Sequence, residues 1–485
     1  MTYSRPTAHV AALVAGLLAG PVLGPVPAHA DPLTCQGQVV TVTGEVGTPG
    51  DDVMVVGSAG VFTANSGAGD DLVCIRVTTG REPFMFTVDA GPGADRVFNE
   101  STDGNTTVQT LLGTGGDSYM GNELGDTVVA GAALWGSSGD TSDTEKDTID
   151  TRGGNDYVTS GSVAPGTPNP DVVTTGDGDD KLSWAGDLTG APVDLAAGTN
   201  RLALYPGWEG TDLHVDATTS TVSADARPVL RWTGQVQAYL LTVDRLRTRF
   251  TGGDADEILT YAVAHPGTPG AVVLPDPDRR LDADMGAGDD SIGEQDFVGG
   301  SLLGGPGDDA LQAARCLEAD VRLGDAFTCL AAYNPRVEYA AAIDAWEHIH
   351  VPGGLVRVVG TSGPDDVHAA GSRVRVMGRG GDDRLVASGS RSTARTPWTV
   401  VLDGGPGADA VWGGYGHDKL VGGSGKDKIA GSSGDDLLLG GGGADRLKAG
   451  KGRDEVRGGQ GRDRADGEAG RDRCSAEVRR SCERG

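Results

Sequence analysis

The chain has 485 residues, of which 80 are glycine, and its aromatic residues amount to 5%. An average protein contains about 7% glycine, so this chain has more than twice the usual share, and a thick core of large side chains is excluded. Its 69 acidic residues outnumber its 40 basic ones and give a net charge of −29. This charge excludes nucleic acid as a general partner, because phosphates would be repelled, and it favours cations.

Residues 1–30 have the pattern of a secretory signal peptide. Arg5 lies in a short polar start, an apolar run covers 10–20, and a small-x-small cleavage site ends at Ala30. The run is shorter than the ~20 residues of a membrane-spanning helix, which argues against an anchor. We therefore expect a secreted or extracellular protein, or one held at the cell surface, without a membrane span.

Residues 31–185 repeat a loose pattern of a glycine-rich turn, an aspartate and a short apolar strand. Its aspartates include Asp52, Asp71, Asp95 and Asp117, which are 19, 24 and 22 residues apart. This spacing predicts a wide, irregular parallel β-helix whose rungs carry looped-out insertions. A set of Asp-Gly turns in a β-sandwich is the alternative.

Residues 186–360 are expected to form an irregular β-rich region with insertions. Alternating apolar residues at 238–243 indicate a strand, and an alanine-rich piece within 313–358 suggests one short helix. Either rungs with long loops or a small inserted subdomain fits this region. The loose pattern recurs here at three aspartates, Asp256, Asp290 and Asp309.

From 404 to 475 the sequence divides into eight blocks of nine residues without a gap. The fourth residue is always glycine, the sixth is always aspartate, and the eighth is aliphatic in the first six blocks. Two looser copies, with aspartates Asp365 and Asp383 that are 18 residues apart, extend this region to 361–475. The sixth residues of the eight blocks are Asp409, Asp418, Asp427, Asp436, Asp445, Asp454, Asp463 and Asp472.

Each position of the block has a physical reason. Six glycine-rich residues form a tight turn, and the remaining triplet forms a short strand with one apolar side chain pointing inward. Two blocks then make one coil, and coils stack about 4.8 Å apart. Alternate aspartates are thereby predicted to form two columns, one containing Asp409 and Asp427 and the other containing Asp418 and Asp436.

Two columns of carboxylates repel each other, and one aliphatic side chain per block buries little surface. A divalent cation between successive turns removes both problems. Calcium takes six to eight oxygens from carboxylates and backbone carbonyls, whereas magnesium demands octahedral geometry and keeps its waters. Transition metals prefer histidine or cysteine, which the blocks lack apart from His417 and Cys474. The columns therefore predict Ca²⁺, with up to six ions between the four turns of each edge.

The blocks resemble the G-G-x-G-x-D-x-U-x nonapeptide of RTX, or hemolysin-type, calcium-binding repeats. The resemblance implies a parallel β-roll in which the eight aspartates at position six are ligands. Ala465 and Cys474 depart from the apolar position, so Asp472 is the least secure ligand. The looser copies extend the candidate ligands to Asp52, Asp71, Asp95, Asp290, Asp309, Asp365 and Asp383.

Two further features bear on the comparison with the RTX family. The stretch 193–199 resembles connector segments found beside such repeats. Many RTX proteins use a C-terminal secretion signal instead of an N-terminal one, so toxin activity is not carried over to this chain.

Six cysteines agree with export, because disulfides persist outside the cell. Of the 15 pairings that six cysteines allow, proximity favours Cys35–Cys74, Cys316–Cys329 and Cys474–Cys482. The last pair would cap the open end of the roll within the tail, 476–485.

These observations predict an all-β, secreted calcium-binding protein whose repeats fold on binding Ca²⁺, with a non-enzymatic structural or binding role. No His-Glu-x-x-His helix or Gly-x-Ser-x-Gly elbow occurs, and degenerate repeats leave little room for an enzyme. One alternative is a calcium-dependent adhesin or matrix protein that binds a cell-surface or extracellular glycan. A related hypothesis is that the basic tail binds an anionic surface polymer through Arg471, Arg473, Arg479, Arg480 and Arg484. The other alternative is a polysaccharide lyase or epimerase with carboxylates converging in a cleft within 52–310.

Overall fold

The computed structural model describes residues 33–57, 62–77, 84–130, 144–162, 167–189, 192–205, 212–243, 247–263, 280–294, 299–313, 316–331, 338–344, 346–389 and 399–482. The secondary structure of these residues is β-strand, with no helix among them. The predicted signal peptide, 1–30, lies outside the described residues. Among those that are described, no helix is long and apolar enough to cross a membrane.

Strands of the solenoid pair in parallel with the strand that lies one full coil further along the chain. In the first column, β4 (Val53–Val56) pairs with β6 (Leu72–Ile75), and β6 pairs with β8 (Arg96–Asn99). The second column contains β5 (Thr63–Gly67) beside β7 (Phe84–Asp89) in the same parallel manner. The predicted parallel solenoid is thus confirmed, and a β-sandwich of antiparallel turns is wrong for this region.

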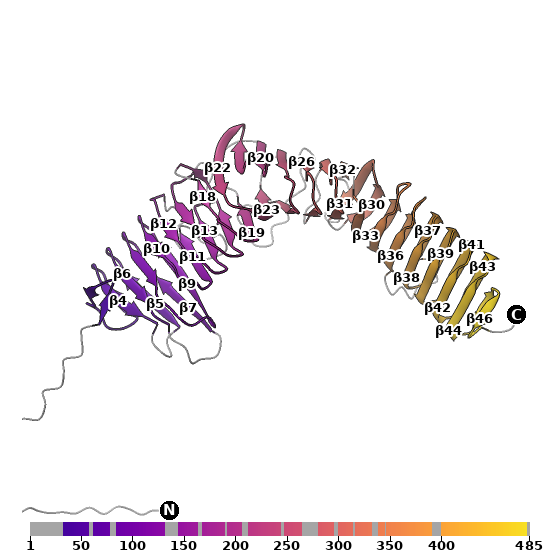
Figure 1. Ribbon diagram of the computed structural model, residues 1–485, viewed down its shortest axis with the longest axis horizontal. Helices are drawn as coiled ribbons and strands as arrows, with labels where there is room; N and C mark the ends of the chain where they lie inside the picture. Colours follow the sequence, from indigo (N-terminus) through magenta and orange to yellow (C-terminus); the bar gives the residue numbers. More distant parts are fainter. Residues whose placement is uncertain are drawn as a thin grey trace, which may run out of the picture.

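The rungs, each a complete coil of the chain, stack along a curved axis from one end of an arch to the other (Figure 1). The first column continues with β10 (Ser118–Met120), β12 (Thr148–Asp150), β15 (Val172–Thr174) and β18 (Val193–Asp194). The second continues with β9 (Thr106–Gly113), β11 (Asp126–Ala130), β13 (Tyr157–Ser160), β16 (Lys181–Trp184), β19 (Asn200–Leu204), β23 (Val236–Val243), β25 (Ile258–Val263), β27 (Ser291–Glu294), β29 (Ala310–Gln312) and β33 (His348–Val359).

Two insertions widen the middle of the arch. In the first, β20 (Asp212–Asp216), β21 (Thr221–Ala224) and β22 (Arg227–Thr233) form antiparallel pairs. The outer strands rejoin the solenoid, since β20 lies parallel to β24 (Arg247–Thr251) and β22 lies parallel to β18. These residues are therefore rungs with added strands.

The second insertion contains β30 (Cys316–Arg322), β31 (Ala326–Ala331) and β32 (Glu338–Asp344), again in antiparallel order. The short helix expected here is wrong. The alanine run 340–342 lies in strand β32, which pairs with β31 on one side. β32 rejoins the stack beside β28 (Gly299–Leu303), which itself follows β26 (Arg280–Asp284).

The C-terminal part is a regular roll of two parallel sheets, as the nine-residue blocks predict. One sheet contains β35 (Arg373–Met377), β37 (Val400–Pro406), β39 (Asp418–Ser424), β41 (Leu437–Gly443), β43 (Glu455–Gly461) and β45 (Arg473–Ser475). The other contains β34 (Asp366–Gly371), β36 (Arg384–Gly389), β38 (Ala410–Tyr415), β40 (Lys428–Ser433), β42 (Arg446–Gly452), β44 (Arg464–Gly470) and β46 (Val478–Arg480). From β37 to β45 in the first sheet and from β38 to β44 in the second, the partners are 18 residues apart, as where Val400 of β37 faces Asp418 of β39. The spacing is 26 residues from β35 to β37 and from β36 to β38.

A single apolar core runs along the whole arch, from Met54 to Ala465. In the strict blocks it consists of the apolar residue at position eight of the first seven blocks, each at most 2% exposed, together with Ala449. Burying one such side chain contributes about 1.5–3 kcal/mol. The core of the strict blocks is therefore thin, and it does not stabilise the glycine-rich turns.

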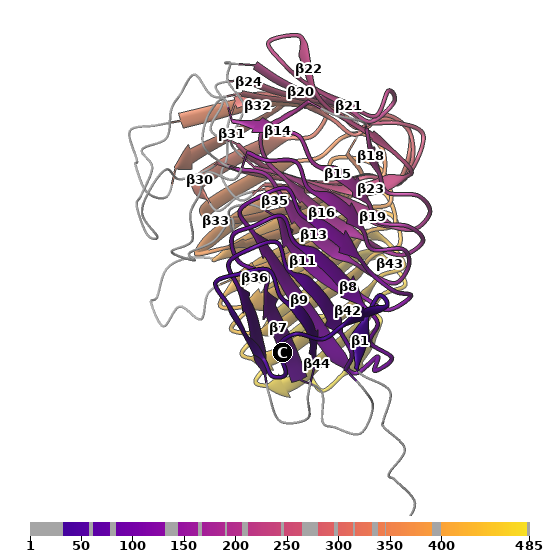
Figure 2. The same ribbon diagram turned by 90° about the vertical axis from the view of Figure 1, so that its left-hand side faces the viewer.

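Disulfides close both ends of the described chain. Cys35 of β1 (Thr34–Cys35) is bonded to Cys74 of β6, and Cys474 of β45 is bonded to Cys482 of the tail, as expected. In Figure 2, which looks along the arch, β1 at one end and β44 near the other both lie in the lower part of the view. The predicted third pair lies outside the part described, because the side chains of Cys316 and Cys329 are not among the described ones.

Candidate metal centre

The aspartates at position six lie on the inner face of the roll. Side chains alternate between the two faces of a strand, so positions six, eight and one all point inward. The burial of Asp418, Leu420 and Gly422 along β39 follows this alternation. All eight aspartates of the strict blocks are at most 2% exposed.

These aspartates form the two columns that the sequence predicts. In the first column, Oδ1 of Asp427 accepts a hydrogen bond from the backbone N–H of Asp409 at 2.9 Å, and the contact repeats down the column. In the second, Oδ1 of Asp436 accepts one from the N–H of Asp418 at 2.8 Å. The remaining steps are Asp365 to Asp383, Asp383 to Asp409, Asp427 to Asp445, Asp445 to Asp463, Asp436 to Asp454 and Asp454 to Asp472, all at 2.9–3.0 Å except 2.8 Å for the fifth.

The second carboxylate oxygen, Oδ2, has no protein partner. It is buried without a hydrogen bond in seven of the eight aspartates of the strict blocks and in Asp383. A buried ionised group without a partner is costly. Burial, together with the neighbouring carboxylates, raises the pKa of Asp436 to about 8, and burial raises that of Asp418 to about 7.

A small space lies beside each Oδ2, and the glycine at position one creates it. A Cβ added to Gly422 would come closer than 3.0 Å both to Oδ2 of Asp427 and to the carbonyl oxygen of Gly440 in the next rung. Gly431 has the same surroundings, with Oδ2 of Asp436 and the carbonyl oxygen of Ala449. We call this space, bounded by Oδ2 and the next rung's position-one carbonyl, the cradle.

The cradle suits a hard cation. Ca²⁺ binds oxygens at about 2.3–2.6 Å, a distance at which a carbon atom would clash with them. Within the residues described, no three His, Cys, Asp or Glu side chains converge on one point. A cation would therefore be held by aspartates of successive rungs together with backbone carbonyls, which is an all-oxygen donor set. Asp409, Asp427, Asp436, Asp445 and Asp463 are the residues best placed to hold it.

A family model described as the RTX calcium-binding nonapeptide repeat matches the chain in four copies, at 143–163, 359–392, 403–438 and 439–474. The chain therefore contains RTX calcium-binding nonapeptide repeats. The last three copies cover the roll and contain all eight aspartates of the strict blocks. A search of curated proteins finds no match to the chain.

The upstream RTX-like aspartates form columns of the same kind. Asp52 donates its backbone N–H to Oδ1 of Asp71 at 2.8 Å, and the column continues through Asp95 and Asp117. Further along the arch, Asp290 donates in the same way to Asp309 at 2.9 Å. The structure thus places every candidate aspartate in a column, and their role as ligands stays a prediction.

One residue was assigned wrongly within its repeat. Asp256 is exposed, and the neighbouring Glu257, only 3% exposed, donates its backbone N–H to Oδ1 of Asp290 at 2.7 Å. Glu257 therefore occupies position six, because its side chain points inward and that of Asp256 points outward.

Other members of the columns were missed by sequence reasoning. Asn200 accepts the N–H of Asp180 at 3.0 Å, so the expected connector 193–199 begins an ordinary rung. Glu347 and Glu477 accept the N–H groups of Asp309 and Asp463 with a carboxylate oxygen. Asp126, Asp147 and Asp171 also lie in the columns. The signal that would find them is an inward aliphatic residue two positions later, as with Leu202 after Asn200.

Proposed function

We propose that this chain is an exported calcium-binding protein whose roll, 361–475, folds when Ca²⁺ fills its cradles, and that its role outside the cell is structural or binding. The observation that carries the proposal is the stack of buried Oδ2 atoms without protein partners. Ions that bind the folded turns and not the random chain stabilise the fold by mass action. The low calcium of the cytoplasm would leave the roll open for export.

The inward position of the upstream acids also supports a non-enzymatic role. Asp71, Asp95 and Asp290 are each 1% exposed and lie inside the solenoid. A polysaccharide lyase or epimerase needs carboxylates that a polymer can reach in a cleft. These three of the acids from 52 to 310 that the enzyme alternative invokes therefore lie inside the fold, out of reach of a polymer.

Substitution of the proposed ligands tests the proposal. Asp427 and Asp445 each have a neighbouring aspartate on both sides in one column, and Asp427→Asn and Asp445→Asn should each remove the Oδ2 ligand of a cradle while keeping an oxygen for the N–H bond. We expect calcium titration, followed by circular dichroism of the full chain, to require at least about tenfold more calcium for each. Asp403→Asn, on the exposed face of β37, is the matched control. An unchanged midpoint in both ligand variants would remove them as ligands.

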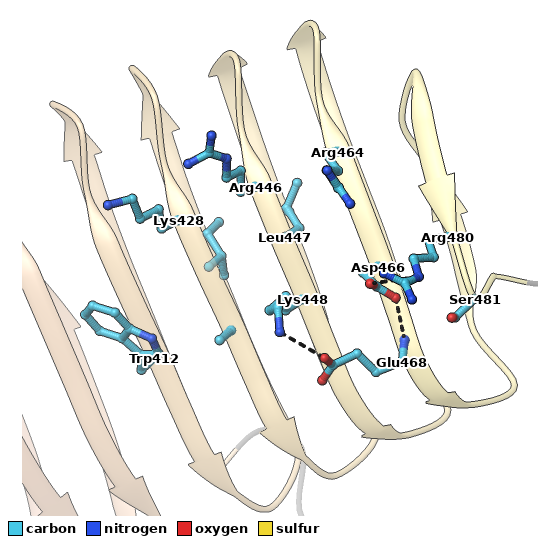
Figure 3. A pocket seen from close by; sticks show the side chains of 12 residues that line it. Trp412, Lys428, Arg446, Leu447, Lys448, Arg464, Asp466, Glu468, Arg480 and Ser481 are labelled. Carbon is cyan, nitrogen blue, oxygen red and sulfur yellow. Dashed lines mark hydrogen bonds and ion pairs between the residues drawn. The ribbon is translucent and has the colours of Figure 1, made fainter.

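A groove on the outside of the roll favours a second function, calcium-dependent adhesion to an anionic glycan. Lys428, Arg446 and Arg464 occupy the same register on β40, β42 and β44. Figure 3 shows these three side chains along one groove that also contains Trp412. The groove has a volume of about 690 Å³. The adjacent Lys448 forms an ion pair with Glu468 at 3.0 Å. Among the described residues that line the groove, Lys428, Arg446 and Arg464 then provide positive charge for a ligand.

Binding of dextran sulfate, with neutral dextran as reference, tests adhesion. Replacing Lys428, Arg446 and Arg464 together by glutamine should weaken binding about tenfold or more, because three cations of one column are lost. A control that replaces Lys426, Lys451 and Arg462, all exposed residues of the turns, removes the same charge elsewhere. Equal losses in both triple variants would point to net charge instead of the groove and would count against the second function.

A further inference from the structure

The residue at position one differs between the two parts of the solenoid. In the roll it is glycine beside seven of the eight strict-block aspartates, and Ala449 is the exception. Upstream, six aspartates of the columns have a residue with a side chain at this position, and all six of these residues are at most 2% exposed. The six pairs are Ser66 with Asp71, Ala90 with Asp95, Leu112 with Asp117, Thr151 with Asp156, Thr175 with Asp180 and Met285 with Asp290.

Two of these side chains donate a hydrogen bond to the carbonyl oxygen that corresponds to the one bounding the cradle in the roll. The Ser66 hydroxyl donates to the carbonyl oxygen of Ala90, which is position one of the next rung, at 2.6 Å. The Thr151 hydroxyl donates to the carbonyl oxygen of Thr175, the equivalent atom one rung on, at 3.0 Å. A protein hydrogen therefore satisfies an oxygen that would otherwise face a cation.

Apolar side chains occupy the same position in three other rungs. Ala90, Leu112 and Met285 are fully buried and belong to the continuous core. Hydrocarbon offers no oxygen to Ca²⁺ and excludes the ligand water that would complete its shell. The core is thus broader in these rungs, where it reaches into the turns.

Protein donors also bind both carboxylate oxygens in two upstream rungs. Asp126 accepts a hydrogen bond on Oδ1 from Asn99 at 2.5 Å and on Oδ2 from the backbone N–H of Asn122 at 3.3 Å. Asp171 accepts one on Oδ1 from the N–H of Asp147 at 3.0 Å and one on Oδ2 from Ser160 at 2.7 Å. No ion is needed to satisfy the oxygens of Asp126 and Asp171, which belong to two rungs outside the six. In five of those six rungs, by contrast, Oδ2 of the aspartate is buried without a protein partner.

We propose that position one decides which rungs hold calcium, and that side chains there make the six upstream rungs calcium-independent. Asp71, Asp95 and Asp290, which the sequence offers as ligands, then accept a hydrogen bond on Oδ1 inside the fold. Their Oδ2 atoms are buried without a protein partner as in the roll, and the difference lies in the side chain at position one. The chain has a permanently folded part that adjoins a calcium-dependent roll. This inference rests on the proposed function, since the contrast requires that the roll itself binds calcium.

Region-resolved hydrogen exchange on the full chain separates the two claims. Peptides from 84–130 and 144–189 should be equally protected in calcium and in chelator, whereas peptides from 399–475 should lose protection in chelator. Loss of protection in both regions would overturn the inference and leave the proposed function standing. Protection that is unchanged in the roll would refute the proposed function, and with it the contrast on which the inference rests.

Single substitutions at position one test the rule directly. Gly440→Ala places a methyl group between Oδ2 of Asp445 and the carbonyl oxygen of Gly458, and we expect native mass spectrometry of the full chain to count at least one calcium ion fewer. Gly442→Ala, two residues away in the same turn with no atom within 4 Å of the added Cβ, should leave the count unchanged.

The reverse substitution, from alanine to glycine, distinguishes control of calcium binding from a loss of folding. Ala449→Gly opens the cradle beside Asp454 and should raise the calcium affinity or the ion count. If Gly440→Ala and Gly442→Ala kept the same count, or if Ala449→Gly lowered it, position one would not control binding and the inference would be wrong.

Discussion

Removal of calcium from the full chain is expected to unfold the roll. Each filled site contributes about 2.7 kcal/mol when calcium is a hundredfold above its dissociation constant. Three filled sites then contribute about 8 kcal/mol, which is comparable with the whole stability of a typical domain, about 5–15 kcal/mol. Because each strand of the first seven strict blocks adds little more than one apolar side chain to the core, burial does not compensate for this loss.

Circular dichroism and differential scanning calorimetry measure this loss. In excess chelator we expect the β-sheet signal to fall by the share that the roll contributes, and the calorimetric transition of the roll to disappear. Magnesium at the same concentration should restore little, because it demands octahedral geometry and keeps its waters. A transition that kept its temperature and enthalpy in chelator would contradict the prediction.

Acidification is expected to refold the calcium-free roll. Burial raises the pKa of Asp436 to about 8, of Asp383 and Asp418 to about 7, and of Asp427 and Asp454 to about 6, from 3.8 in each case. A raised pKa in the folded state means that the folded chain binds protons more tightly than the unfolded one. The stability from these groups is complete below about pH 4 and is lost as the pH rises through about 6–8.

The calcium-loaded roll should respond in the opposite direction. Protons and Ca²⁺ compete for the same carboxylates, so calcium affinity should rise from about pH 5 to about pH 8 as the carboxylates lose their protons. Thermal unfolding of the full chain across this range, with and without calcium, measures both slopes. Asp436→Asn should flatten the calcium-free slope, and a calcium-free roll that became more stable towards pH 8 would contradict the prediction.

The sequence predicted the parts of the fold where the period is strict. Nine-residue spacing placed Asp409 and Asp427 in one column and Asp418 and Asp436 in the other, because equal block lengths leave only one stacking register. It also predicted a parallel solenoid upstream, where the spacing varies, since extra residues can leave a rung as loops without disturbing the strand pairs.

Sequence reasoning failed where the column needs only an acceptor. Asn200 and Glu347 provide an oxygen for the N–H of the preceding rung, so a search for aspartate alone does not find them. The sequence predicts Asp256 at position six where the structure has Glu257, because both residues follow the same turn and only the direction of the side chain distinguishes them. The antiparallel strands β21 and β31 were not predicted, since a strand added at the edge of a rung leaves no period of its own.

The contrast at position one also required the structure. The sequence shows Gly422 and Leu112 at equivalent places, but it does not show that the side chain at this place points at Oδ2 of the aspartate. Only the inward direction of positions one, six and eight brings these groups together in the turn. The candidate site is therefore a property of two positions and not of the aspartate alone.

Native mass spectrometry of the mature, full-length chain tests the central claim most directly. With calcium present we predict several bound ions per chain, up to about six from the strict blocks, that are absent after chelation and not replaced by equal numbers of magnesium ions. A chain that carries the same mass in calcium, in magnesium and in chelator would contradict the account.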